Sequence, residues 1–272
     1  MRGLSMKRIF LFGFLFFVSN VFAVIYTPAD VAEFRKAAAR GDAEAQCELG
    51  VCYEYGFGVQ EDLKQAVVWY RKAAEQGYAE AQLYLAHCYY KGIGVQKDLK
   101  QAVVWYRKAA EQGEKEAQYN LGLCYYNGFG VQKDLKQAVH WYRKAAEQNE
   151  VDALCNLGNC YYNGHGVQKN PEKAVFWYRK GIEQRYPRAQ CNLGICYHNG
   201  EGVEKDLKQA VYWYREAAEQ GYADAQFYLG FCYAYGYGVE KDLKQAVVWY
   251  HKAAKQGHAK AREALKRVSV LR

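Results

Sequence analysis

The sequence predicts an all-α protein built as a stack of repeats, and two regularities indicate this fold class. All six tryptophans are spaced 36 residues apart, at Trp69, Trp105, Trp141, Trp177, Trp213 and Trp249. A glycine-rich stretch, "NGFGVQKDLKQ" from Asn127, recurs in closely similar form with the same spacing. A strict period of this length is typical of stacked-repeat architectures. The chain has only three prolines in 272 residues, which suits helices.

Residues 1–23 are predicted to be a secretory signal peptide. Lys7 and Arg8 precede an apolar run from Ile9 to Val18, and Ala23 closes a small-residue pattern. We expect cleavage after Ala23 and export to the periplasm or the medium. The alternative is an uncleaved N-terminal anchor, although the run is short for a membrane span. The mature chain contains no segment that resembles a transmembrane helix.

The remaining sequence divides into six full units flanked by half units. Residues 24–41 are predicted to form an N-terminal linker and capping helix, and residues 258–272 a C-terminal capping helix. Such half units are expected at the ends of a stacked array. The six units are 42–77, 78–113, 114–149, 150–185, 186–221 and 222–257.

Each unit contains two helical patterns. In the first, "KEAQYNLGLCYYNG" (115–128), Ala117, Leu121, Cys124 and Tyr125 recur at helical spacing, and Gly128 stands where a left-handed residue ends a helix. The second, "DLKQAVHWYRKAAEQ" (134–148), carries an apolar stripe. The stripe consists of Leu135, Ala138, Val139, Tyr142, Ala145 and Ala146.

The glycine-rich loop between the two patterns is predicted to be structural. The fourth unit has Asn170-Pro171 where the others have Asp-Leu, and these residues favour a helix N-cap followed by the first helical position. The matching aspartates are therefore expected to cap their own helices, which leaves few donors for a phosphate. They are Asp62, Asp98, Asp134, Asp206 and Asp242.

The full pattern, A-x-x-x-L-G-x-x-Y-x-x-G-x-G-V-x-x-D-x-x-x-A-x-x-W-Y-x-x-A-A-x-x-G, resembles the Sel-one-like repeat, a relative of the tetratricopeptide repeat, over about residues 31–268. The resemblance implies a right-handed α-solenoid, or superhelix, of antiparallel helix-turn-helix repeats whose first helices line a concave groove. It also implies an adaptor or scaffold protein. Many bacterial members of the family are exported, and some are linked to host interaction.

Composition argues against several functional classes. After residues 1–23, the chain has 34 bases and 29 acids, a net charge of +5 that is too small to favour nucleic acid. Ser269 and Thr27 are then its sole serine and threonine, which argues against serine hydrolase chemistry. Its histidines have no metal-binding spacing, so we expect neither a metal nor a cofactor.

The nine cysteines are predicted to be small buried side chains. Six form a ladder with the 36-residue spacing, and neighbours in stacked helices lie about 10 Å apart, beyond the reach of a disulfide. A cysteine-rich branch of the family is associated with β-lactam binding and has two cysteines in each repeat. Here three of the six repeats have only one. The ladder is Cys52, Cys88, Cys124, Cys160, Cys196 and Cys232, and the others are Cys47, Cys155 and Cys191.

Candidate binding residues lie where the repeats differ most, on one face of the first helix. Offsets of four and seven residues place these variable positions together, and aromatic side chains are common binding anchors. Drift among solvent-facing positions is the alternative interpretation. The candidates are His87, Tyr90, Lys91, Tyr119, Tyr126, Asn127, Asn159, Tyr162, Asn163, His198, Asn199, Phe227 and Phe231.

The sequence as a whole predicts an exported, monomeric, non-enzymatic scaffold that binds a protein or peptide through its groove. A glycan is an alternative ligand, and a purely structural role in the envelope is an alternative function. The alternative from another class is a protein that binds or hydrolyses β-lactams or acts on the cell wall. Turnover of a chromogenic β-lactam, abolished by a chelator or a thiol blocker, would favour that class.

Overall fold

The computed structural model describes residues 26–270, and helices are the regular elements of this part of the chain. Fourteen helices and no strands occur in it, which confirms the predicted all-α solenoid class. The predicted signal peptide, residues 1–23, lies outside the described residues, so that prediction stays a prediction.

The helices belong to two compact units, with the boundary between Gln112 and Gly113. Unit 1 contains α1 (Pro28–Ala39), α2 (Ala43–Tyr55), α3 (Leu63–Glu75), α4 (Ala79–Lys91) and α5 (Leu99–Glu111). Unit 2 contains α6 (Lys115–Asn127), α7 (Leu135–Glu147), α8 (Val151–Asn163), α9 (Pro171–Glu183), α10 (Pro187–Asn199), α11 (Leu207–Glu219), α12 (Ala223–Tyr235), α13 (Leu243–Lys255) and α14 (Ala259–Val270).

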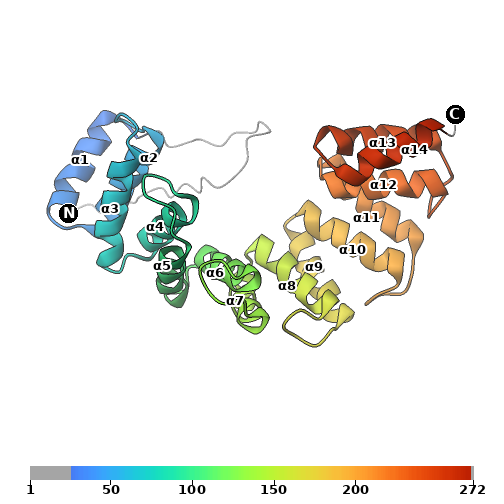
Figure 1. The fold of residues 1–272 in the computed structure, drawn as a ribbon, viewed down its shortest axis with the longest axis horizontal. Helices are drawn as coiled ribbons and strands as arrows, with labels where there is room; N and C mark the ends of the chain where they lie inside the picture. Colours follow the sequence, from blue (N-terminus) through green and yellow to red (C-terminus); the bar gives the residue numbers. More distant parts are fainter. Residues whose placement is uncertain (1–25, 271–272) are drawn as a thin grey trace. The chain divides into compact units, whose positions relative to one another are not determined.

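Helices that follow one another in sequence also pack against one another. Each first helix (α2, α4, α6, α8, α10 and α12) packs on the second helix that follows it (α3, α5, α7, α9, α11 and α13). Each pair then packs on the next pair of the same unit, as Figure 1 shows for the helices of unit 2. Short connections make such neighbours antiparallel helix hairpins, so each repeat buries its apolar face against its neighbours.

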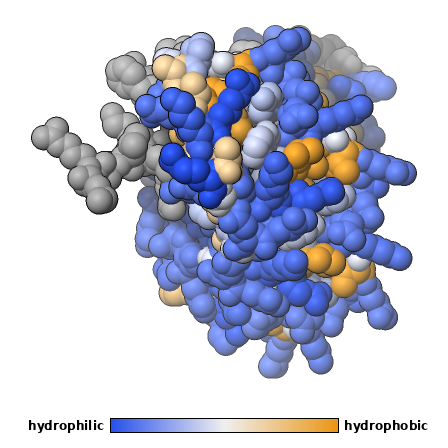
Figure 2. Space-filling model, turned by 90° about the vertical axis from the view of Figure 1, so that its left-hand side faces the viewer, coloured by the Kyte–Doolittle hydropathy of each residue, from blue (hydrophilic) through white to orange (hydrophobic). Residues whose placement is uncertain are grey.

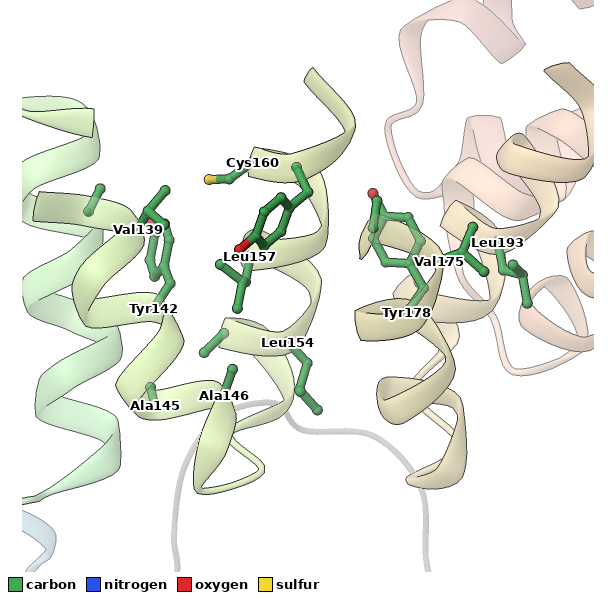
Figure 3. Close-up of a cluster of buried hydrophobic side chains, with 14 of the residues drawn as sticks. Val139, Tyr142, Ala145, Ala146, Leu154, Leu157, Cys160, Val175, Tyr178 and Leu193 are labelled. Carbon is green, nitrogen blue, oxygen red and sulfur yellow. The ribbon is translucent and has the colours of Figure 1, made fainter. Parts of the chain in front are cut away.

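The second helices provide the largest buried side chains. Tyr142 and Tyr178 are fully buried, and Figure 3 shows their rings on either side of the helix that carries Leu154 and Leu157. The predicted stripe of α7 is confirmed at Ala138, Val139, Tyr142, Ala145 and Ala146, all of which are buried. The nine cysteines are also buried, as predicted, and all are free thiols.

The loop between the two helices of a repeat is a structural turn, as the sequence predicts. Asp134 accepts hydrogen bonds from the backbone N–H groups of Lys136 and Gln137 at 2.9 and 3.0 Å, and the four equivalent aspartates do the same. Asn170 caps α9, with Pro171 at the first helical position. Each capping Asp or Asn side chain therefore occupies backbone N–H donors that an anion bound at this helix end would need.

Two glycines show why the loop has its sequence. Gly128 ends α6 in the left-handed region, with φ of 79°, where a Cβ would be strained. Gly166, in the next loop, lies against the backbone of Leu135 in the preceding repeat, and an added Cβ would lie about 2.1 Å from its carbonyl oxygen. A larger residue at Gly166 would push adjacent repeats apart.

The surface drawn in Figure 2 is largely hydrophilic, with hydrophobic side chains in separate small patches. The described helices are 12 or 13 residues long. Within residues 26–270, none is both long and apolar enough to span a membrane.

Candidate functional site

A pocket of about 370 Å³ lies on the first helices of unit 2. This volume falls within the range that suits a small ligand or a few side chains. The pocket is lined by Tyr119, Leu123, Tyr126, Asn127, Tyr142, Asn156, Asn159, Cys160 and Arg188.

Three consecutive first helices and one second helix position these side chains. Tyr119, Leu123 and Tyr126 lie four and three residues apart on α6, so they share a helix face. α8 contributes Asn156, Asn159 and Cys160, while α10 contributes Arg188. Tyr142 reaches the pocket from α7, and its ring centroid lies 6.0 Å from that of Tyr119.

Hydrogen bonds within one repeat and between neighbouring repeats fix the polar lining. Nη2 of Arg188 donates to Oδ1 of Asn156 at 2.6 Å, and Nη1 lies 3.5 Å from Oδ1 of Asp152. The hydroxyl of Tyr178 donates to Oδ1 of Asn159 at 2.7 Å. The Tyr178 bond lies within one repeat, whereas the Arg188 contacts join that repeat to the next, so the complete pocket exists only in the stacked array.

Burial keeps the tyrosine hydroxyls and the cysteine thiol of the pocket lining protonated. Burial is the largest cause that raises the pKa of Tyr119 to about 12, and it also raises the pKa of Tyr142. Burial raises the pKa of the Cys160 thiol to about 12. At neutral pH these groups are uncharged, so within the described part of the chain Arg188 supplies the charge of the lining.

The structure brings four of the predicted site residues into this pocket: Tyr119, Tyr126, Asn127 and Asn159. Tyr126 is half-buried, and its hydroxyl lies 2.9 Å from Nδ1 of His165 in the next loop. Asn127 is exposed, but its amide donates to the backbone oxygen of Leu123. Asn127 therefore also serves its own helix end.

Other predicted residues of unit 2 lie outside the pocket lining. The amide of Asn199 donates to the hydroxyl of Tyr162 at 2.9 Å, and the amide of Asn163 donates to the backbone oxygen of Asn159. These contacts join one repeat to the next or cap a helix end. Their role in binding stays a prediction.

An aromatic cluster near α12 holds three further candidates. His198, Phe227 and Phe231 are half-buried. The ring of Phe231 lies 4.7 Å from that of Tyr235 and 5.6 Å from that of Tyr237. Tyr235 is 58% exposed, so this cluster reaches the solvent.

The three remaining candidates, His87, Tyr90 and Lys91, belong to unit 1. Burial, together with the nearby Lys91, lowers the pKa of His87 to about 4, so its imidazole is neutral at physiological pH. Tyr90 is half-buried and Lys91 is exposed. The ring centroids of Tyr90 and Tyr106 lie 6.4 Å apart.

Sequence reasoning missed three polar residues of the pocket, namely Arg188, Asn156 and the second-helix Tyr142. The sequence could have identified Arg188, because the other five repeats have an acidic residue at its position. Tyr142 left none, since every repeat has a tyrosine there for its core.

Residues 26–270 hold no group of three or more histidine, cysteine or acidic side chains arranged to bind a metal ion. The cysteines also lack the surroundings of reactive thiols. Burial raises the pKa of Cys124 and Cys196, like that of Cys160, to about 12, whereas reactive cysteines have a lowered pKa.

Comparison with protein families identifies the repeat. The Sel1 repeat model matches six consecutive segments: 43–78, 79–114, 115–150, 151–186, 187–222 and 223–258. The chain therefore belongs to the Sel1 repeat family, as its sequence pattern predicts. Proteins of this family are scaffolds that commonly bind protein partners.

Two solved structures share this architecture. A protective antigen of uropathogenic Escherichia coli with an SLR fold has 39% sequence identity and a TM-score of 0.80 over 88% of this chain. The match covers 51% of that protein, so the chain spans about half its length. A Sel1 repeat protein from Oxalobacter formigenes has 38% identity and a TM-score of 0.77, over 83% of this chain and 90% of that protein. The comparison with curated proteins found no match.

Proposed function

We propose that this protein is a non-enzymatic scaffold that binds an extended segment of a partner protein on the first helices of unit 2. The observation that carries the proposal is the pocket between α6, α8 and α10, which lies where the repeats differ in sequence. The second helices hardly differ between repeats, and they build the core. Variation that is confined to one face of a repeat array is typical of a binding surface.

The chemistry of the pocket supports binding over catalysis. Cys160 is the thiol in its lining, and its raised pKa keeps it protonated and weakly nucleophilic. Tyrosine rings and asparagine amides, which make up most of the lining, are suited to a peptide because they combine apolar area with hydrogen bonding.

Crosslinked capture of partners by the chain from residue 24 onward tests this function. Tyr126→Ala and Asn159→Ala, combined, should reduce the recovery of a captured partner by at least tenfold, because both remove pocket contacts. The matched control is Phe176→Ala on α9, where a side chain that is 52% exposed is truncated outside the pocket. Equal recovery by the pocket variant and the control, with helicity intact, would sink the proposal.

We also propose that the protein is exported and acts in the periplasm or outside the cell. The basic and apolar pattern of residues 1–23 supports export, as does the similarity to a protective antigen. Cell fractionation with N-terminal sequencing tests this proposal. A full-length chain in the cytoplasmic fraction, starting at Met1, would contradict it.

A further inference from the structure

One repeat position changes the sign of its charge at the pocket. The position near the start of each first helix is acidic in five repeats and basic in one. The residues are Glu44, Glu80, Glu116, Asp152, Arg188 and Asp224. Arg188 therefore places a positive charge where the repeat pattern otherwise has a negative one, and its side chain lines the pocket.

Arg188 has donors left over after its contacts within the chain. The guanidinium has five N–H groups in a planar fork. It donates to Asn156 at 2.6 Å and pairs with Asp152 at 3.5 Å. The hydroxyl of Tyr186 also donates to Oδ1 of Asp152, which spreads the charge of that carboxylate over two donors. In the described part of the chain, Arg188 has no further acceptor, so part of the fork is free for a ligand.

Asn159 is held with its donors turned away from its neighbours. Its Oδ1 accepts from the hydroxyl of Tyr178 at 2.7 Å and from Nδ2 of Asn192 at 3.1 Å. Two donors on the same oxygen fix the orientation of the amide. The Nδ2 group, on the other branch of the amide, has no acceptor among residues 26–270.

Asn156 extends this arrangement of donors. Its Oδ1 accepts from Nη2 of Arg188 at 2.6 Å, and its N–H donors lie on the other branch of the amide. Tyr119 and Tyr142, which also line the pocket, have protonated hydroxyls because burial raises the pKa of both.

The pocket thus presents several hydrogen-bond donors and one positive charge, and its lining contains no carboxylate. We propose that it binds a carboxylate of the partner peptide, with the oxygens on Arg188 and Asn159; this inference rests on the proposed peptide-binding function. A guanidinium fork matches the two oxygens of a carboxylate. Asp152 lies beside Arg188 and would repel a second negative charge, so the site favours a singly charged carboxylate over a phosphate.

Selection from displayed random peptides tests this inference without a known partner. One library displays peptides with a blocked C-terminus, and a second displays them with a free C-terminus; each is selected against the chain from residue 24 onward. A side-chain ligand predicts enrichment of Asp or Glu at one position in the blocked library. A terminal carboxylate predicts that enriched sequences bind only with a free C-terminus.

Charge reversal at Arg188 then links the selected carboxylate to the pocket. Arg188→Glu restores the acid found in the other repeats, and it should weaken the selected peptides at least tenfold in fluorescence anisotropy. Arg179→Glu makes the same charge change at an exposed position of α9 and should have an effect smaller than twofold. Should Arg188→Glu fold poorly by circular dichroism, Asn159→Asp provides a second variant that puts a negative charge in the pocket and should also weaken binding.

The outcomes separate the two proposals. If neither library yields binders, the peptide-binding function fails, and the carboxylate inference fails with it. If binders are selected but tolerate Asn or Gln in place of their acid, or bind Arg188→Glu and Asn159→Asp as tightly as the unaltered chain, the carboxylate inference alone is overturned.

Discussion

The two units use the same core tyrosine but give its hydroxyl different partners. In unit 1, Tyr70 donates to Oε2 of Glu54 at 2.6 Å. In unit 2, the equivalent Tyr178 donates to Oδ1 of Asn159 at 2.7 Å. Both tyrosines are fully buried on second helices, and both partners come from the preceding first helix. The scaffold is shared, and the chemistry of the face is set by the first helix.

Further tyrosine hydroxyls of unit 1 also donate to carboxylates of first helices. In unit 1, Glu48 accepts from the hydroxyl of Tyr26 at 2.6 Å, and Glu80 accepts from that of Tyr84 at 2.9 Å. Burial is the largest cause that raises the pKa of Glu48 and Glu54, so their ionised forms are stabilised less than in water. These carboxylates use the tyrosine donors within the chain. In unit 2, a carboxylate also accepts from a tyrosine, as Asp152 does from Tyr186, but the acceptors that line the pocket are amides. Oδ1 of Asn159 accepts from Tyr178 and Oδ1 of Asn156 accepts from Arg188, and each amide has N–H donors of its own.

This contrast teaches how a repeat array acquires a binding site. An ionised carboxylate only accepts hydrogen bonds, so it adds no donor to the face of the repeat. An amide accepts a hydrogen bond through its oxygen and can still donate through its NH2 group. Exchanging one for the other on the first helix changes what the face can bind while the second-helix core stays the same.

Truncating the core tyrosines should have the largest effect, and it should be similar in both units. Tyr70→Ala and Tyr178→Ala each leave a cavity in the stack, at a cost of about 3–5 kcal/mol in the free energy of unfolding. Urea unfolding followed by circular dichroism measures it. A cost below about 1 kcal/mol in either unit would show that the two units do not share the same core.

Removing only the hydroxyl should separate the units. Tyr70→Phe leaves the half-buried Glu54 without its bond from Tyr70 and should cost about 1.5–3 kcal/mol, as for a bond to a charged group. Tyr178→Phe should cost about 0.5–1.5 kcal/mol, because Asn159 is neutral and keeps its bond from Asn192.

The pH dependence of the Tyr70→Phe variant gives a second measurement. The bond from Tyr70 lowers the pKa of Glu54, so its loss raises that pKa further above the ordinary value. A carboxyl with a raised pKa in the folded state lowers stability as pH rises from the unfolded to the folded pKa. The loss in Tyr70→Phe should therefore be larger at pH 8 than at pH 4. An equal loss at both pH values would contradict the assigned partner.

Glu116 occupies the same position in its repeat as Arg188 does in the fifth repeat, and its substitution should have a smaller effect on stability. Burial, with Glu150 and Glu114 nearby, raises the pKa of Glu116 to about 7. Between its ordinary value of 4.5 and about 7, the folded state binds more protons than the unfolded state, so stability falls as pH rises. Glu116→Gln should therefore be neutral at pH 4 and stabilising by about 1–2 kcal/mol at pH 8.

Thermal unfolding across this pH range measures the gain. Glu147→Gln on α7 is the matched control, since it removes an exposed acid and should change stability by less than about 0.5 kcal/mol at every pH. A Glu116→Gln variant without any gain at pH 8 would show that this carboxyl is better solvated than its place in the fold indicates.

Sequence reasoning predicted the helices and their caps because these depend on local patterns. Asp134 as N-cap, Gly128 as helix end and the buried stripe of α7 follow from residue type and spacing. The pocket depends on contacts between repeats. The orientation of the Asn159 amide is set by Tyr178 and Asn192, 19 and 33 residues away, and no local pattern encodes it. Comparison of equivalent positions would have identified Arg188, because its charge departs from the repeat.

The contact of Gly166 with Leu135 has a consequence for how such a protein can change in length. The same contact recurs between Gly94 and Leu63, and between Gly238 and Leu207, each time 31 residues apart. Duplication or deletion of one whole 36-residue segment recreates this contact at the new junction. An insertion of one residue within a second helix shifts the loop away from its neighbour. Genetic variants of this chain are therefore expected to gain or lose whole repeats, each of which brings its own first helix and thus a new set of side chains for selection to act on.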